Sequence, residues 1–110
     1  MEFQRIKNHE TYLTFPLLDS ENYEPYYTSA WSALSGASIV SYSYNDSTSA
    51  VAHTITSTPN RIDSTGLWQL HLSTSETNPN SGNDDYMIIK MDAQEIVSQT
   101  MLIKLVGLYI

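Results

Sequence analysis

The 110-residue chain contains no cysteine. Disulfide bonds, thiolate zinc sites and a cysteine nucleophile are therefore excluded. Its apolar runs fall far short of the roughly 18 residues that a membrane-spanning helix requires. The first ten residues mix charges and lack the apolar core of a signal peptide, so we expect a complete small protein without a leader.

Basic residues are also few. Five Lys and Arg stand against twelve Asp and Glu, and the formal net charge is −7. The basic residues are scattered along the chain: Arg5, Lys7, Arg61, Lys90 and Lys104. Nucleic acids and anionic membranes both attract clustered positive charge, so we expect neither as a partner.

Serine and threonine make up about a quarter of the chain, whereas charged residues are only 15%. Ser and Thr compete for backbone hydrogen bonds inside helices, and Thr favours strands. The composition therefore predicts an all-β fold. We expect a polar N-terminal arm over residues 1–10 and one domain over residues 11–110, because this length suits a single domain.

The clearest strand pattern lies in residues 66–72, where Trp68, Leu70 and Leu72 alternate with Gln69 and His71. A period of two places every second side chain on one face of a sheet. Trp68 is the largest apolar side chain on that face, so we expect it to anchor the core.

Other segments alternate in the same way: residues 11–18, 37–45, 49–58, 86–92 and 96–110. About six or seven short strands with polar turns between them are typical of a small antiparallel β-sandwich. The expected core residues are Leu13, Phe15, Val40, Tyr42, Val51, Ile55, Trp68, Leu70, Leu72, Met87, Ile89, Ile103 and Leu105.

The last segment, residues 96–110, is apolar on both faces near its end. Either a second layer covers it, or it contacts another subunit. On the second interpretation Leu108 and Tyr109 are interface candidates.

Aromatic residues are densest in residues 23–34. This segment can form a short amphipathic helix after Pro25, or a loop that stacks its rings on the sandwich. Tyr23, Tyr26, Tyr27 and Trp31 either cover one end of the core or form a contact patch for another subunit or a carbohydrate.

The histidines His9, His53 and His71 lack the close spacing of a metal-ligand motif. The polar loop over residues 78–85 carries oxygen ligands but lacks the alternating Asp residues and the bidentate Glu of a calcium loop. We therefore expect neither a metal nor another cofactor.

Catalytic patterns are equally scarce. No serine sits in a nucleophile elbow, and there is no glycine-rich phosphate loop. Asp84 and Asp85 are adjacent, so on a strand they point to opposite faces, and we expect them at a solvated loop tip. These observations predict a protein that is not an enzyme.

Four motifs carry a family resemblance: residues 34–39 (LSGASI), 57–62 (STPNRI), 66–73 (GLWQLHLS) and 76–78 (ETN). With them the chain resembles a small Ig-like β-sandwich module found in virion proteins of tailed bacteriophages. The resemblance spans roughly residues 12–109 and carries no catalytic residues.

The resemblance implies a structural protein of the virion, made in the host cytoplasm. The leading expectation is a capsid decoration or cement protein that stabilises the head. A neck, tail or baseplate adaptor and a carbohydrate- or surface-binding module are the alternatives. The implied partners are other virion proteins (the major capsid protein, or tail and neck proteins) and further copies of the chain in a homo-oligomer.

Overall fold

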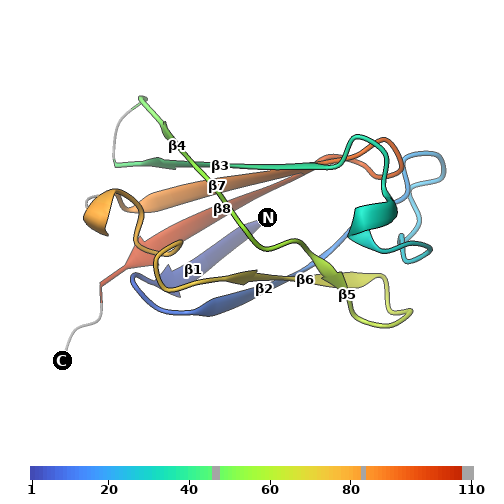
Figure 1. The fold of residues 1–110 in the computed structure, drawn as a ribbon, viewed down its shortest axis with the longest axis horizontal. Helices are drawn as coiled ribbons and strands as arrows, with labels where there is room; N and C mark the ends of the chain where they lie inside the picture. Colours follow the sequence, from blue (N-terminus) through green and yellow to red (C-terminus); the bar gives the residue numbers. More distant parts are fainter. Residues whose placement is uncertain (46–47, 83, 108–110) are drawn as a thin grey trace.

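The computed structural model describes residues 1–45, 48–82 and 84–107. The strands of this part of the chain are β1 (Glu2–Ile6), β2 (Thr11–Pro16), β3 (Ser38–Tyr44), β4 (Val51–His53), β5 (Asn60–Arg61), β6 (Leu67–Leu72), β7 (Tyr86–Asp92) and β8 (Gln99–Val106). They form a five-stranded sheet, β1-β8-β7-β3-β4, and a three-stranded sheet, β2-β6-β5 (Figure 1). The predicted all-β sandwich is confirmed.

The pairing is antiparallel except between β1 and β8, which run parallel. Two short 3₁₀ turns, η1 (Trp31–Ala33) and η2 (Pro79–Gly82), are the helical elements of the described residues. Within those residues, no helix is long and apolar enough to cross a membrane.

The core lies between the two sheets and is built from the alternating apolar side chains of their facing strands. The predicted core residues found buried there are Leu13, Phe15, Trp68, Leu70, Leu72, Met87, Ile89, Ile103 and Leu105. Ile55 is partly buried and packs against this cluster. Strand β2 ends at Pro16 and lies at a sheet edge, as a residue without an N–H donor requires.

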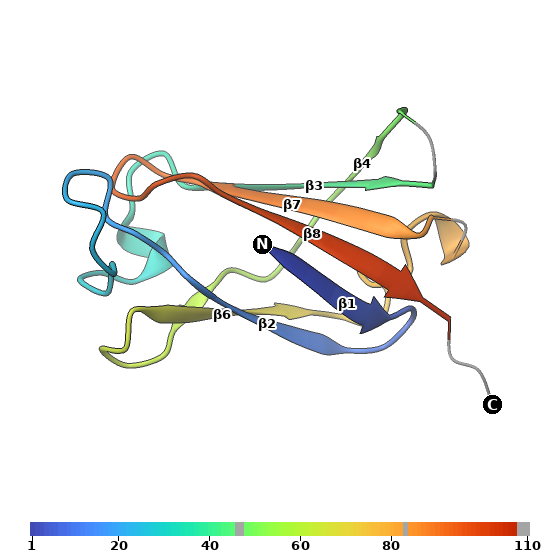
Figure 2. The same ribbon diagram turned by 180° about the vertical axis from the view of Figure 1, so that it is seen from behind.

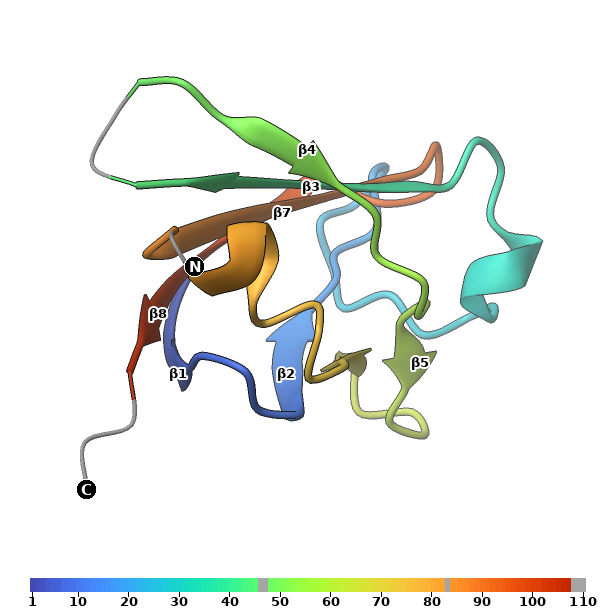
Figure 3. The ribbon, with the colours of Figure 1, turned by 60° about the vertical axis from the view of Figure 1, so that its left-hand side comes forward.

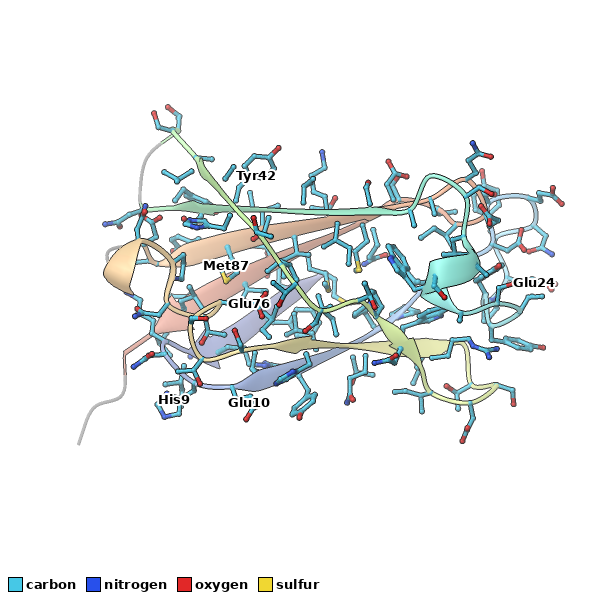
Figure 4. The ribbon with its side chains drawn as sticks, in the orientation of Figure 1. His9, Glu10, Glu24, Tyr42, Glu76 and Met87 are labelled. Carbon is cyan, nitrogen blue, oxygen red and sulfur yellow. The ribbon has the colours of Figure 1, made fainter. Side chains whose placement is uncertain are left out.

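The prediction for β3 is wrong in its choice of face. Val40 is 41% exposed and Tyr42 is only half-buried, whereas Ser41 and Ser43 are 1% and 0% exposed. In Figure 4, Tyr42 lies outside the five-stranded sheet while Met87 points into the core. The outward face suits tyrosine because its ring can pack on neighbours while its hydroxyl stays in water.

Val51 is also misassigned to the core, because it is 45% exposed. It begins β4, which pairs with β3 over three residues only and forms the edge of the sheet. The predicted antiparallel pairing of β3 and β4 is present, but the second strand is much shorter than the predicted one, and residues 46 and 47 of the predicted turn lie outside the described residues.

The N-terminal residues do not form a free arm. Residues 2–6 are the edge strand β1, which pairs in register with residues 102–106 of β8. Phe3 is half-buried and packs against the core, and the Lys7 N–H donates to the Val106 carbonyl at 2.8 Å. The segment is polar because its alternate side chains, such as Gln4, face water.

The aromatic segment is a loop rather than a helix. After β2 the chain runs around one end of the sandwich, with bridges from Leu18 to Pro25 and from Asp19 to Ile96. Only η1 is helical, and Trp31 is 7% exposed. The loop alternative for this segment is therefore correct (Figure 3).

Candidate functional site

The solvent-facing side of the five-stranded sheet is unusually apolar for an exposed surface. Because side chains alternate, residues opposite the core positions of β3, β7 and β8 point outward together. We call this surface the outer face. Its residues are Val40, Tyr42 and Tyr44 from β3, Tyr86, Ile88 and Lys90 from β7, and Leu102, Lys104 and Val106 from β8.

Strand register arranges these residues in rows across the sheet. Leu102, Ile88 and Tyr42 are directly paired neighbours and form the central row. In the next row Tyr44 and Tyr86 stack, with ring centroids 5.0 Å apart and planes 14° from parallel. Cross-strand aromatic pairs of this kind also stabilise the sheet.

No described segment crosses in front of β3, β7 or β8 when the sheet is viewed from this side (Figure 2). The central side chains Ile88 and Leu102 are half-buried by their neighbours alone. The apolar second face predicted for the last strand is thus real over residues 102–106. Leu108 and Tyr109, the interface candidates at its end, lie outside the described residues.

Two cations are set into the outer face. Lys90 lies between Val40 and Thr100, and Lys104 lies between Tyr86 and Gln4. Both lysines are exposed. The ion pairs found among the described residues involve neither of them.

The aromatic cluster, for which the sequence offers a core cover or a contact patch, divides into two parts. Tyr26 and Trp31 are 6% and 7% exposed and cover one end of the core. Tyr23 and Tyr27 are 67% and 46% exposed. A sugar-stacking platform needs an open aromatic face, which Trp31 does not offer.

A polar cluster that sequence reasoning missed lies beneath the end of β3. The Ser43 hydroxyl donates to Asp84 Oδ2 and lies within hydrogen-bond distance of His53 Nε2. The Asn80 side-chain amide donates to the same Asp84 oxygen at 2.8 Å. Asp84 is 7% exposed, so the prediction of a solvated tip is wrong for this residue.

This cluster contains the residue types of a serine hydrolase but in a different arrangement. In a catalytic triad the carboxylate orients the imidazole, and the imidazole activates the serine. Here the partners of Asp84 are Ser43 and Asn80, and Ser43 is fully buried. The geometry suits satisfied polar groups at the edge of the core rather than a nucleophile open to substrate.

His71 points outward from the three-stranded sheet, opposite the apolar face of β6, as predicted. It stacks on Tyr12, its cross-strand partner, with ring centroids 4.6 Å apart. Its Nε2 atom lies 2.6 Å from Glu10 Oε1. In Figure 4 Glu10 lies next to β2, an edge strand of this sheet, and close to His9.

The histidines and carboxylates do not converge on a metal site. Across residues 1–45, 48–82 and 84–107, no group of three or more His, Asp or Glu side chains is placed to hold an ion. In the loop predicted to lack a calcium pattern, Asp84 bonds to protein donors, and Asp85 pairs with Lys7 at 3.0 Å.

No protein-family model matches the chain, and no curated protein is significantly similar to it. Function must therefore be inferred from the sequence motifs and from the molecular surface. On that surface the outer face combines three tyrosines with partly exposed aliphatic side chains.

Proposed function

We propose that the chain is a non-enzymatic structural protein of a tailed-bacteriophage virion, and specifically a decoration protein that stabilises the head. The observation that carries this proposal is the outer face of the five-stranded sheet. It presents Tyr42, Tyr44, Tyr86, Ile88 and Leu102 to solvent on a rigid sheet. Contiguous apolar patches of this kind mark protein contact sites.

Rigidity suits a structural role. Side chains fixed on paired strands lose little conformational freedom on binding, and tyrosine gives a large contact area at low entropic cost. A decoration protein also acts through many weak contacts repeated over a lattice, so each copy needs only a modest surface.

The interior supports the same proposal. Its most reactive combination of residues, Ser43 with His53 and Asp84, is used in internal hydrogen bonds. The motifs in residues 57–78 that resemble the phage module also have structural tasks. Gly66 adopts φ +80° before β6, and Ser73 and Glu76 form a reciprocal capping box, with bonds of 2.8 and 3.3 Å.

The test is the location and copy number of the chain in purified particles of the phage that encodes it. Heads and tails are separated, and the chain is quantified by mass spectrometry against the major capsid protein as an internal standard. A decoration protein is expected in many copies and in the head fraction. A few copies confined to the tail fraction would replace this role by that of a connector, and absence from particles would overturn both.

A further inference from the structure

We propose that the outer face is the docking surface, and that its occupant is an acidic surface of a different virion protein rather than a second copy of this chain. This inference rests on the proposed function and adds to it the orientation of the molecule and the chemistry of its partner. Its starting point is the pair Lys90 and Lys104.

The two lysines are the charged side chains among the nine residues of the outer face, although the chain as a whole is acidic. The chain has five basic residues against twelve acidic ones, and two of the five stand on this face. Glu2 and Asp92 lie on the same side of the sheet: Glu2 is on the edge strand β1 beside Leu102, and Asp92 ends β7 and accepts a hydrogen bond from Ser98 at 2.7 Å. Among the described residues, the area between them holds two cations without a carboxylate partner.

The position of the lysines within the apolar rows decides what can cover them. Lys104 is one row from Leu102 on β8, and Lys90 is one row from Ile88 on β7. A partner that covers Ile88 and Leu102 also approaches both ammonium groups and displaces part of their water. Burying a charge without an opposite charge or hydrogen-bond acceptors is strongly unfavourable. The partner must therefore place carboxylates opposite Lys90 and Lys104.

A second copy cannot supply those carboxylates from its own outer face. Two outer faces packed about a two-fold axis would bring four lysines into one interface, with acids only at the margins. An unlike, acidic surface with an apolar centre satisfies both the lysines and the central row.

The size of the face fits a modest specific contact. The three strands of the outer face, about 4.8 Å apart and about seven residues long at about 3.3 Å each, give a footprint of about 14 by 23 Å, or about 330 Å². Protruding side chains make the accessible area larger than this flat footprint. A specific interface of standard size buries about 800 Å² per partner, so the outer face can supply the central part of one.

The first test is zero-length cross-linking of intact particles with a carbodiimide, which joins a lysine amine to a carboxylate in direct contact. We expect Lys90 and Lys104 to be joined to Asp or Glu of another virion protein. Lys7, which pairs with Asp85 of its own chain, is the internal control. Mixed isotope labelling identifies links between copies, and links from Lys90 or Lys104 to a second copy would overturn the proposed occupant.

The second test is rebinding of the purified full-length chain to particles that lack it. The double variant Lys90→Gln/Lys104→Gln is expected to bind at least about tenfold more weakly, with a smaller dependence on salt. The control Thr14→Glu/Asn60→Glu changes net charge equally, at exposed positions on the outside of the three-stranded sheet. It is expected to bind like the wild type.

The two proposals fail in different ways. If the chain is absent from particles, the proposed function fails. If the chain is a virion component but the double lysine variant, shown to be folded by its melting temperature, rebinds as well as the wild type, the docking face is wrong and the virion role stands. If the lysine variant and the control weaken binding to the particles equally, the effect comes from net charge alone. That result would also overturn the proposed docking face.

Discussion

The indole Nε1 of Trp68 donates a hydrogen bond of 2.9 Å to the backbone carbonyl of Tyr26. The two rings also stack, with centroids 6.4 Å apart. Trp68 is fully buried on β6, whereas Tyr26 belongs to the loop that follows β2. One side chain therefore fills the core and fastens the aromatic loop over the end of the sandwich.

Replacing Trp68 with Ala should lower the free energy of unfolding by about 3–5 kcal/mol, since it leaves a large cavity and an unpaired carbonyl at Tyr26. Trp68→Phe keeps most of the apolar volume and should cost less. Gln69→Ala, on the outer side of the same strand, should change stability by no more than about 0.5 kcal/mol. Denaturant unfolding measures all three, and near-native stability of Trp68→Ala would contradict the core assignment.

Gly66 and Gly36 form a matched pair for a second prediction. Both have positive φ, +80° and +65°, but a Cβ at Gly66 would clash with the side chain of Pro25, whereas a Cβ at Gly36 meets nothing. Gly36→Ala should therefore lower the free energy of unfolding by only about 1 kcal/mol, the cost of placing an alanine backbone at positive φ. Gly66→Ala should lower the free energy of unfolding clearly more, because the aromatic loop that contains Pro25 must also move to make room for the Cβ. Thermal unfolding of the two variants gives the comparison. Equal losses of stability would show that the loop moves aside at no measurable cost.

Strands β6 and β7 could be predicted in detail because their own sequences decide their faces. Large apolar residues such as Trp68 and Met87 occupy one side, and Gln69 or Lys90 occupies the other. β3 could not be predicted in this way. Its inward residue Ser43 is accommodated by Asp84, which lies 41 positions away, and a contact so distant leaves no signal in the local pattern.

Ser41 and Ser43 on β3 provide a third prediction, because they share one face but differ in their bonding. Ser41 Oγ is buried and has no hydrogen-bond partner among the described residues, whereas Ser43 Oγ bonds to Asp84. Ser41→Ala removes an unsatisfied polar group and should raise the free energy of unfolding, by about 1 kcal/mol. Ser43→Ala should lower it by about 1–3 kcal/mol, since Asp84 loses a donor. Chemical denaturation should give opposite signs, and stabilisation by Ser43→Ala would refute the polar cluster.

The candidate site was only partly visible in the sequence. The second apolar face of β8 and the outward position of Ile88 could be read from alternation. The outer face as a whole could not, because it requires the register that pairs Ile88 with both Leu102 and Tyr42. Conversely, the sequence left open whether Trp31 is buried or accessible, because a cluster of aromatics has the same composition whether it covers a core or a partner.

The parallel strand β1 leads to the final prediction, because it replaces the expected arm by a structural element. Phe3 pairs with Ile103 and packs against the core, while Gln4 beside it is exposed. Phe3→Ala should lower the free energy of unfolding by about 1–2 kcal/mol through lost apolar burial, and Gln4→Ala should leave it nearly unchanged. Deleting residues 1–6 should cost more than Phe3→Ala, because β8 also loses its edge partner. Amide hydrogen exchange provides the decisive measurement: the deletion should expose the amides of β8 that bond to β1, and unchanged protection there would mean that residues 2–6 are an arm after all.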